Sequence, residues 1–92
     1  MGGQRTIFFH SAFRHGFSPD DYREVLQNRN MVLRSRRGVP NVYEILGRND
    51  AGEYIHIVTR RRLQPGERLV VVFHMSRMNE ADRRRYRQGT GL

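Results

Sequence analysis

The sequence contains no cysteine, no lysine and no tryptophan. The absence of cysteine excludes disulfides, thiolate nucleophiles and cysteine-based zinc sites, and it is typical of proteins from a reducing compartment. No run of apolar residues approaches the ~18–20 that a membrane-spanning helix needs. The few apolar residues that follow Arg5 are also too short a run for the core of a secretory signal peptide. We therefore expect a cytoplasmic protein with no membrane partner.

All seventeen basic residues are arginines, and with nine acidic residues they give a formal net charge of +8. Guanidinium groups keep their charge and bind phosphates and carboxylates through paired hydrogen bonds. A GC-rich genome would also favour arginine over lysine, but the physical consequence is the same. The composition favours a polyanionic partner, with nucleic acid ahead of a membrane surface.

Ninety-two residues correspond to one domain, which we expect to span residues 1–92. This length excludes a two-domain enzyme with a separate cofactor-binding fold, and we expect no cofactor. Apolar residues at helical spacing predict a short helix over residues 8–15, although residues 5–9 could equally form an edge strand. The segment Ser18-Pro19-Asp20-Asp21 combines a serine cap, proline at the first helical position and an acid that completes a capping pair. It predicts a helix over residues 19–29 that buries three residues beneath Phe17, namely Tyr22, Val25 and Leu26.

From Met31 onward the apolar residues recur with a period of two, which predicts four strands at residues 31–37, 42–48, 54–61 and 69–76. The loops between them are too short for parallel returns, so neighbouring strands should be antiparallel. Asn79 then restarts a helix that carries several arginines and ends at Gly89. The sequence therefore predicts an α+β fold, with N-terminal helices packed on a four-stranded antiparallel sheet and a short basic C-terminal helix.

Alternation along the predicted strands assigns a face to each residue. The apolar set should pack on the helices: Tyr43, Ile45, Ile55, Ile57, Leu69, Val71 and Phe73. The opposite face should carry Glu44, Arg48, His56, Arg60 and His74. A three-residue loop at 50–52, with Gly52 in the left-handed conformation, would pair Arg48 with Tyr54 and Leu46 with His56.

A five-residue loop at 63–67 would place Arg62 opposite Arg68 and His56 directly opposite His74. The first hairpin leaves open the side taken by Arg34 and Arg36.

This polar face has the groups that metal-free RNA cleavage needs. An imidazole or carboxylate can remove the 2′-hydroxyl proton, a second imidazole can protonate the leaving oxygen, and arginines can stabilise the phosphorane. A solvated sheet face would produce the same alternation. Two histidines without a third ligand make a poor zinc site, so we expect no metal.

Arginine runs and single aromatic residues have two interpretations each. The runs can be solvated faces or phosphate contacts, and the candidate nucleic-acid-binding residues are Arg34, Arg36, Arg60, Arg61, Arg62, Arg83, Arg84 and Arg85. Tyr86 can anchor the last helix to the sheet or stack on a base. For His10 and His15 we favour a local structural role.

The order of elements, with three sequence segments, resembles the BrnT-type toxins of the RelE superfamily over residues 8–88. The segments are Arg14-His15-Gly16-Phe17-Ser18, Tyr43-Glu44-Ile45-Leu46-Gly47-Arg48, and Val70 to Arg77 followed by the helix from Asn79 to Tyr86. The resemblance implies a toxin–antitoxin ribonuclease that cleaves RNA without metal and is silenced by a cognate antitoxin. It implies site roles for Arg48, Arg77 and Tyr86, with His74 as an addition specific to this sequence.

Together these inferences give the candidate catalytic residues Glu44, Arg48, His56, His74, Arg77 and Tyr86. Two other classes of function remain open: a non-catalytic RNA- or DNA-binding module, and a small basic partner for an acidic protein. RNA and an antitoxin are the expected partners, and the sequence leaves self-association into a homo-oligomer open.

Overall fold

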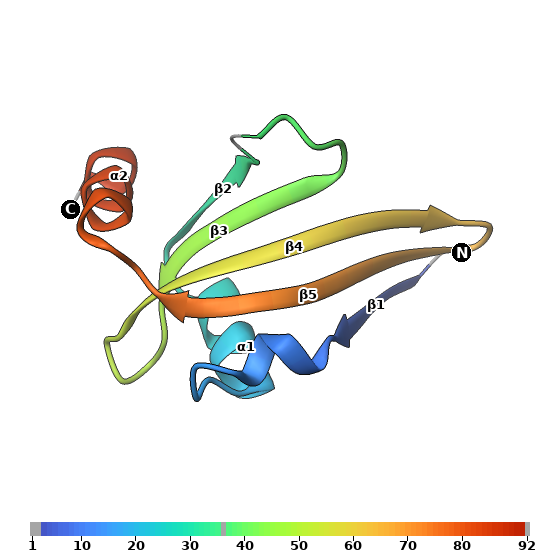
Figure 1. The fold of residues 1–92 in the computed structure, drawn as a ribbon, viewed down its shortest axis with the longest axis horizontal. Coiled ribbons are helices and arrows are strands. Elements are labelled where there is room, and N and C mark those ends of the chain that lie inside the picture. The colour runs from blue at the N-terminus through green and yellow to red at the C-terminus, as the bar shows by residue number, and fades with distance from the viewer. Residues whose placement is uncertain (1–2, 36, 92) are drawn as a thin grey trace.

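The computed structural model describes residues 3–35 and 37–91 and shows one five-stranded mixed sheet in an α+β fold (Figure 1). The strands are β1 (Gly3–Phe8), β2 (Asn30–Arg34), β3 (Val42–Arg48), β4 (Tyr54–Gln64) and β5 (Glu67–Arg77). The helices are the 3₁₀ helix η1 (His10–Phe13), α1 (Pro19–Gln27) and α2 (Glu80–Thr90). The spatial order of the strands is β1-β5-β4-β3-β2. Over the described ranges, no helix is both long and apolar enough to cross a membrane.

The predicted four-stranded antiparallel sheet is wrong in one respect, since β1 adds a fifth strand that pairs with β5 in parallel. Of the two alternatives for this segment, the edge strand is confirmed as β1, and the helix over residues 8–15 is reduced to η1, because residues 3–8 pair their backbone with β5. Beyond the end of β1, η1 covers the edge of β5, where the Ser11 hydroxyl donates to the carbonyl of Phe73 at 2.8 Å. This contact protects an otherwise open strand edge.

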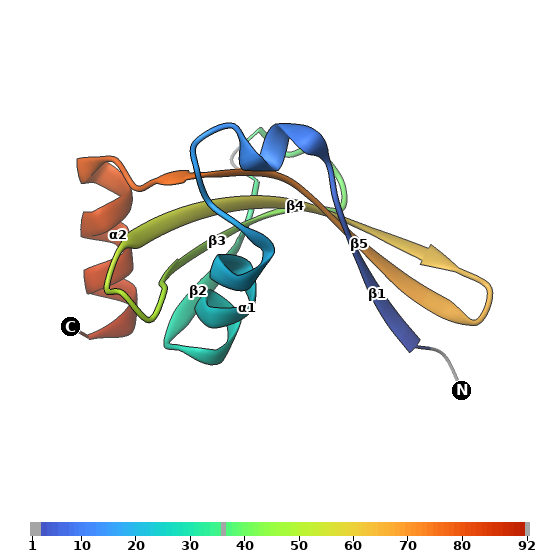
Figure 2. The same cartoon turned by 90° about the horizontal axis from the view of Figure 1, so that it is seen from below.

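Helix α1 begins as the sequence predicts and lies against the sheet (Figure 2). Its capping pair is present, with the backbone N–H of Ser18 donating to the Asp21 carboxylate at 2.8 Å. The helix ends at Gln27 rather than near residue 29. The predicted burial of Leu26 is wrong, since that residue is 41% exposed. It lines a surface groove, whereas the buried side of the helix carries Tyr22 and Val25.

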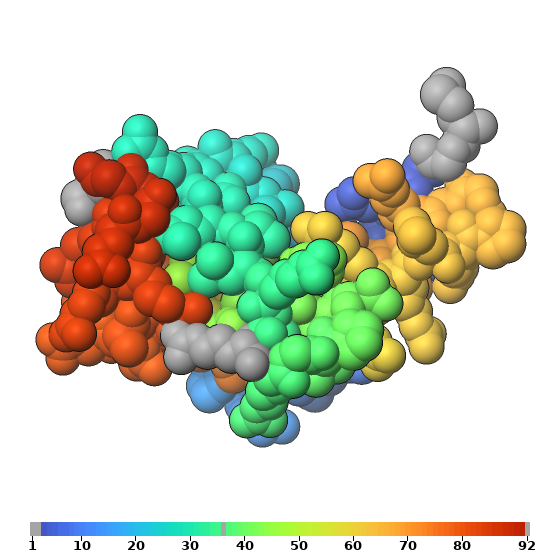
Figure 3. Space-filling model, turned by 90° about the horizontal axis from the view of Figure 1, so that it is seen from above, coloured from blue at the N-terminus to red at the C-terminus, as the bar shows by residue number. Residues whose placement is uncertain are grey.

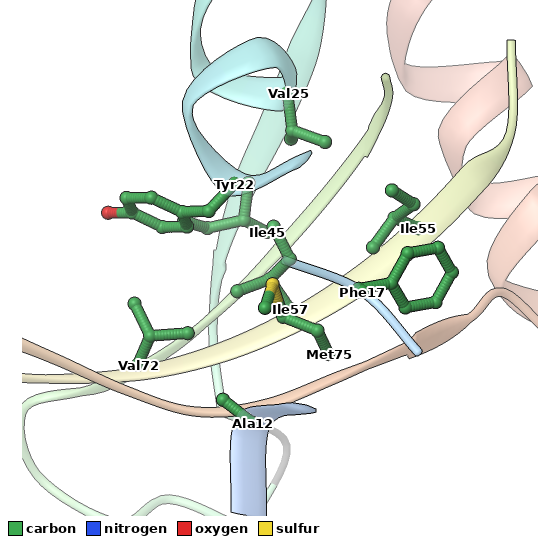
Figure 4. Close-up of a cluster of buried hydrophobic side chains, with 9 residues drawn as sticks. All are labelled: Ala12, Phe17, Tyr22, Val25, Ile45, Ile55, Ile57, Val72 and Met75. Carbon is green, nitrogen blue, oxygen red and sulfur yellow. The ribbon is translucent and has the colours of Figure 1, made fainter. Parts of the chain in front are cut away.

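Two apolar clusters occupy opposite faces of the sheet. The cluster under α1 is shown in Figure 4 and contains Ala12, Phe17, Tyr22, Val25, Ile45, Ile55, Ile57, Val72 and Met75. The smaller cluster joins α2 to the other face through Leu46, Met78 and Tyr86. The assignment of Ile55 and Ile57 to the α1 face is therefore confirmed. The opposite face is only partly polar, because α2 covers one end of it.

The hairpin between β3 and β4 follows the predicted pairing. Gly52 has a φ of 84°, and Arg48 pairs with Tyr54 while Leu46 pairs with His56. In the first hairpin Arg34 pairs with Tyr43, which places Arg34 on the α1 face. Arg36 lies outside the described residues.

The hairpin between β4 and β5 differs from the prediction, because Gln64 pairs with Glu67 and leaves only Pro65 and Gly66 in the turn. A β-bulge then leaves Phe73 without a partner on β4, since Thr59 pairs with Val72 and Val58 with His74. As a result Arg62 opposes Leu69 rather than Arg68, and His56 opposes Ser76 rather than His74.

The predicted faces of β5 are wrong on the N-terminal side of the bulge. Val72 packs in the cluster under α1, and Val71, which was predicted to face α1, pairs with Arg60 on the other face. At the C-terminal end, Gly89 lies inside α2, and the helix ends at Thr90 with Gly91 as its cap, whose φ of 73° is left-handed.

Candidate active site

Polar side chains from β3, β4, β5 and α2 meet on the face of the sheet opposite α1. We call this surface the histidine patch and define it by Glu44, His56, His74, Ser76, Asp82 and Arg85. Strand pairing brings the first four together, because Glu44 is opposite Val58, His74 is also opposite Val58, and Ser76 is opposite His56.

The β-bulge determines that His74 belongs to the patch. With strict alternation from the Thr59–Val72 pair, Phe73 would face the patch and His74 would face the core under α1. The extra residue reverses the alternation, so His74 shares a face with His56. A bulge beside a functional surface commonly re-aims a side chain in this way.

Glu44 links His56 to α2. Its Oε1 atom lies 2.8 Å from Nε2 of His56 and 3.4 Å from Nη2 of Arg85. The same Nη2 atom donates to Oδ1 of Asp82 at 2.7 Å. Arg85 Nε is buried, and it has no hydrogen-bond partner within the described part of the chain. The guanidinium is therefore held between two carboxylates.

His74 is the second imidazole of the patch. Its Nε2 atom lies 2.9 Å from the Ser76 hydroxyl, and its ring centroid is 5.9 Å from that of His56. A third ring, that of His15, lies 5.4 Å from His74. His74 therefore lies close to two other imidazoles that come from separate segments.

The charges and hydrogen bonds of the patch lower the pKa values of its two carboxyl groups. Burial alone would raise the pKa of Glu44, but the hydrogen bonds and charges of His56 and Arg85 outweigh it and lower that pKa. The pKa of Asp82 is lowered in the same way. Burial alone would raise it, but several interactions outweigh that effect, and the largest of them is the hydrogen bond from Arg85. Both carboxyl groups are therefore ionised at neutral pH.

The pKa of His74 is lowered, first by burial and then by the charges of His56, His15 and Arg14. Its ring is consequently neutral at pH 7 and can accept a proton. A neutral imidazole beside an imidazole that is held by a carboxylate can serve general acid–base catalysis.

The structure places the remaining candidate catalytic residues outside the histidine patch. Arg48 donates from Nε to the carbonyl of Gly52 at 3.2 Å and lies over the ring of Tyr54. The side chain of Arg77 is 81% exposed and pairs with Glu53 at 3.4 Å. Tyr86 is 2% exposed and its hydroxyl donates to the carbonyl of Arg29 at 2.9 Å, which is the anchoring role considered from sequence.

The two arginine runs do not form single surfaces. Arg61 lies on the α1 face with its guanidinium 4.1 Å from the ring centroid of Tyr43, whereas its neighbours Arg60 and Arg62 point to the other face by alternation. In α2, only Arg85 enters the patch, while Arg83 lies over Tyr54.

Sequence reasoning missed Ser76 and Asp82 and assigned Arg85 only to nucleic-acid binding. Two signals could have found them. Ser76 follows His74 by two residues and so shares its side of the strand. Asp82 and Arg85 are three apart on a capped helix, the spacing of neighbouring side chains. His15 carries no such signal, because a loop brings it to the patch.

Among residues 3–35 and 37–91, no group of three or more histidine, aspartate or glutamate side chains could hold a metal ion. No protein-family model and no curated protein sequence matches this chain.

Proposed function

We propose that this protein is a ribonuclease that cleaves RNA without a metal ion and that the histidine patch is its active site. The observation that supports this function is the pair His56 and His74, whose ring centroids are 5.9 Å apart on one face of a rigid sheet. Side chains at this separation can reach neighbouring oxygens of one phosphodiester. Glu44 and Arg85 complete the set of groups that the reaction uses.

In this mechanism neutral His74 accepts the proton of a ribose 2′-hydroxyl, and the oxygen attacks the adjacent phosphorus. The bond from phosphorus to the 5′-oxygen breaks, and His56 acts as the general acid that donates a proton to that oxygen. The products are a 2′,3′-cyclic phosphate and a free 5′-hydroxyl. Glu44 compensates the charge on the His56 ring, and Arg85 stabilises the negative charge that develops on the phosphorane.

A cognate antitoxin is part of the proposal. It would silence the protein, as the resemblance to BrnT-type toxins implies, and we propose that it does so by covering the histidine patch. The net charge of +8 supports an acidic inhibitor as well as an RNA substrate.

A second candidate, a non-catalytic nucleic-acid-binding module, is favoured by one observation. Arg60, Arg62 and Arg84 are exposed and have no carboxylate partner among the described residues. Such a module would bind RNA and DNA alike and release no cleavage products.

The test measures cleavage of a labelled RNA by the purified protein in the presence of EDTA. Changing His56→Ala or His74→Ala should slow cleavage by roughly 10²–10⁴, the usual contribution of a positioned acid or base. His10→Ala is the matched control, since His10 is exposed on η1 and lies outside the patch. A substrate with a 2′-deoxyribose at the cleaved position should remain intact.

Expression in a bacterium gives an independent measurement. The parent chain should arrest growth and degrade RNA, and the double variant His56→Ala/His74→Ala should do neither. If the double variant is as toxic as the parent, the imidazole mechanism is wrong. If the parent neither cleaves RNA nor arrests growth, the binding module replaces the ribonuclease.

A further inference from the structure

A groove of about 970 Å³ lies on the α1 face of the sheet, opposite the histidine patch. One wall is formed by Leu26 of α1 and Val32 of β2, and the other by the arm of the β4–β5 hairpin. Figure 3 shows the hollow between these two parts of the surface. The active-site proposal makes no use of this groove.

The walls of the groove expose apolar side chains. Leu26, Val32 and Leu63 are 41%, 46% and 83% exposed, and all three line it. Tyr43 contributes an aromatic surface on the same face. Large apolar side chains gathered around one hollow, and rimmed by charge, are typical of protein-binding surfaces.

The groove is also basic. Four arginines border it, and the side chains of two of them, Arg61 and Arg68, lie on the α1 face, whereas Arg60 and Arg62 alternate to the other side of the hairpin. Within the described ranges neither Arg61 nor Arg68 pairs with a carboxylate, and the one acid close to them along the chain, Glu67, pairs with Arg5 at 3.4 Å. The positive charge is therefore available to an acidic ligand.

We propose that this groove binds an acidic, amphipathic helical segment of a partner protein. The arginines match carboxylates on one side of such a segment, and the exposed leucines and Val32 match apolar side chains on the other. A single-stranded nucleic acid would use the arginines but would gain little from aliphatic side chains. A helix about 10 Å wide fills the observed volume with roughly two turns, or about eight residues.

The position of the groove sets its role. Because the sheet separates it from the histidine patch, a helix bound there leaves His56 and His74 accessible. A partner in the groove is therefore distinct from an inhibitor that covers the patch.

The probe is a fluorescent synthetic peptide of about sixteen residues, with leucines along one side of a helix and glutamates along the other. Its binding is followed by fluorescence anisotropy in the absence of RNA. We expect saturable binding that weakens at least tenfold, about 1.4 kcal/mol, in Arg61→Gln/Arg68→Gln. The same loss is expected in Val32→Ser/Leu63→Ser, which changes only exposed side chains.

The matched control is Arg84→Gln/Arg87→Gln, which removes the same charge from α2 and should leave peptide binding unchanged. Circular dichroism melts confirm that each variant is folded.

Three results would overturn the proposal. The first is no binding of the peptide, and the second is equal binding of a peptide whose leucines are replaced by serine. The third is displacement of the peptide by oligouridylate, combined with impaired RNA cleavage in the groove variants. The direct titration contains no RNA, so peptide binding is measured separately from cleavage, and only the competition with oligouridylate involves RNA.

Discussion

Glu44 holds His56 across a strand diagonal: the two residues are not paired, yet Oε1 of Glu44 lies 2.8 Å from Nε2 of His56. The carboxylate engages one ring nitrogen, which fixes the orientation of the ring and leaves Nδ1 for a substrate. In the proposed ribonuclease mechanism such a carboxylate would act through the imidazole, which makes Glu44 a positioning residue.

The substitution Glu44→Gln tests that role, because it keeps the shape of the side chain and removes its charge. We expect RNA cleavage to slow by roughly 10²-fold, the lower end of the contribution of a positioned acid, since the His56 ring itself remains. The pH dependence of cleavage should also change, which a purely structural effect would not cause. Glu53→Gln, outside the patch, is the control. Equal rates and equal pH profiles for the Glu44 variant and the parent would remove Glu44 from the mechanism.

The lowered pKa of His74 predicts how stability depends on pH. In the unfolded chain this ring takes up a proton near its ordinary value of 6.5, whereas the folded protein resists protonation until lower pH. The free energy of unfolding should therefore decrease as pH falls below 6.5 toward the folded-state pKa of His74. Glu44 and Asp82, whose pKa values are lowered from 4.5 and 3.8, add a further loss only in more acidic solution.

Urea melts between pH 7.5 and 5.5 measure this effect. The slope of stability against pH should be smaller in His74→Gln than in the parent and unchanged in His10→Gln. A slope that is the same in all three proteins would show that His74 is not held neutral by the fold.

Tyr86 offers a test between its anchoring role and a catalytic one. Tyr86→Phe removes the hydroxyl that donates to the carbonyl of Arg29, so we expect a loss of about 1 kcal/mol in the free energy of unfolding. RNA cleavage should be unaffected under conditions where the variant is folded. A large loss of cleavage with unchanged stability would instead return Tyr86 to the active site.

Ile57 and Leu63 lie on the same strand and differ in burial. Ile57 is fully buried beneath α1 and Leu63 is 83% exposed. Ile57→Ala should cost about 2–5 kcal/mol through lost apolar burial and the cavity left behind, whereas Leu63→Ala should cost less than about 0.5 kcal/mol. Chemical denaturation of both variants checks the difference, and similar values for the two would contradict the position of the core.

The parts of the fold that the sequence predicted are encoded locally. The cap of α1 depends on residues 18–21, and the β3–β4 hairpin depends on a short loop that ends in Gly52. Alternation then placed Ile55 and Ile57 in the core and His56 on the other face. Each of these signals is contained in a few consecutive residues.

The parts that the sequence left open or missed depend on contacts between distant residues. Local periodicity allowed either a helix over residues 8–15 or an edge strand over residues 5–9, and pairing with β5, more than sixty residues later, decides for the strand. The shared face of His56 and His74 was predicted through an incorrect register. The two-residue turn shifts the pairing by one position and the bulge at Phe73 shifts it by one more, so the original parity returns.

The bulge at Phe73 has a consequence for evolutionary comparison. A relative that lacked this residue would have a strictly alternating β5 and would still present the equivalent of His74 beside His56, because the deletion removes the extra residue and its shift together. Alignments of this chain with distant homologues should therefore allow a one-residue gap inside the strand. An ungapped alignment would match the patch histidine of one protein with a core residue of the other.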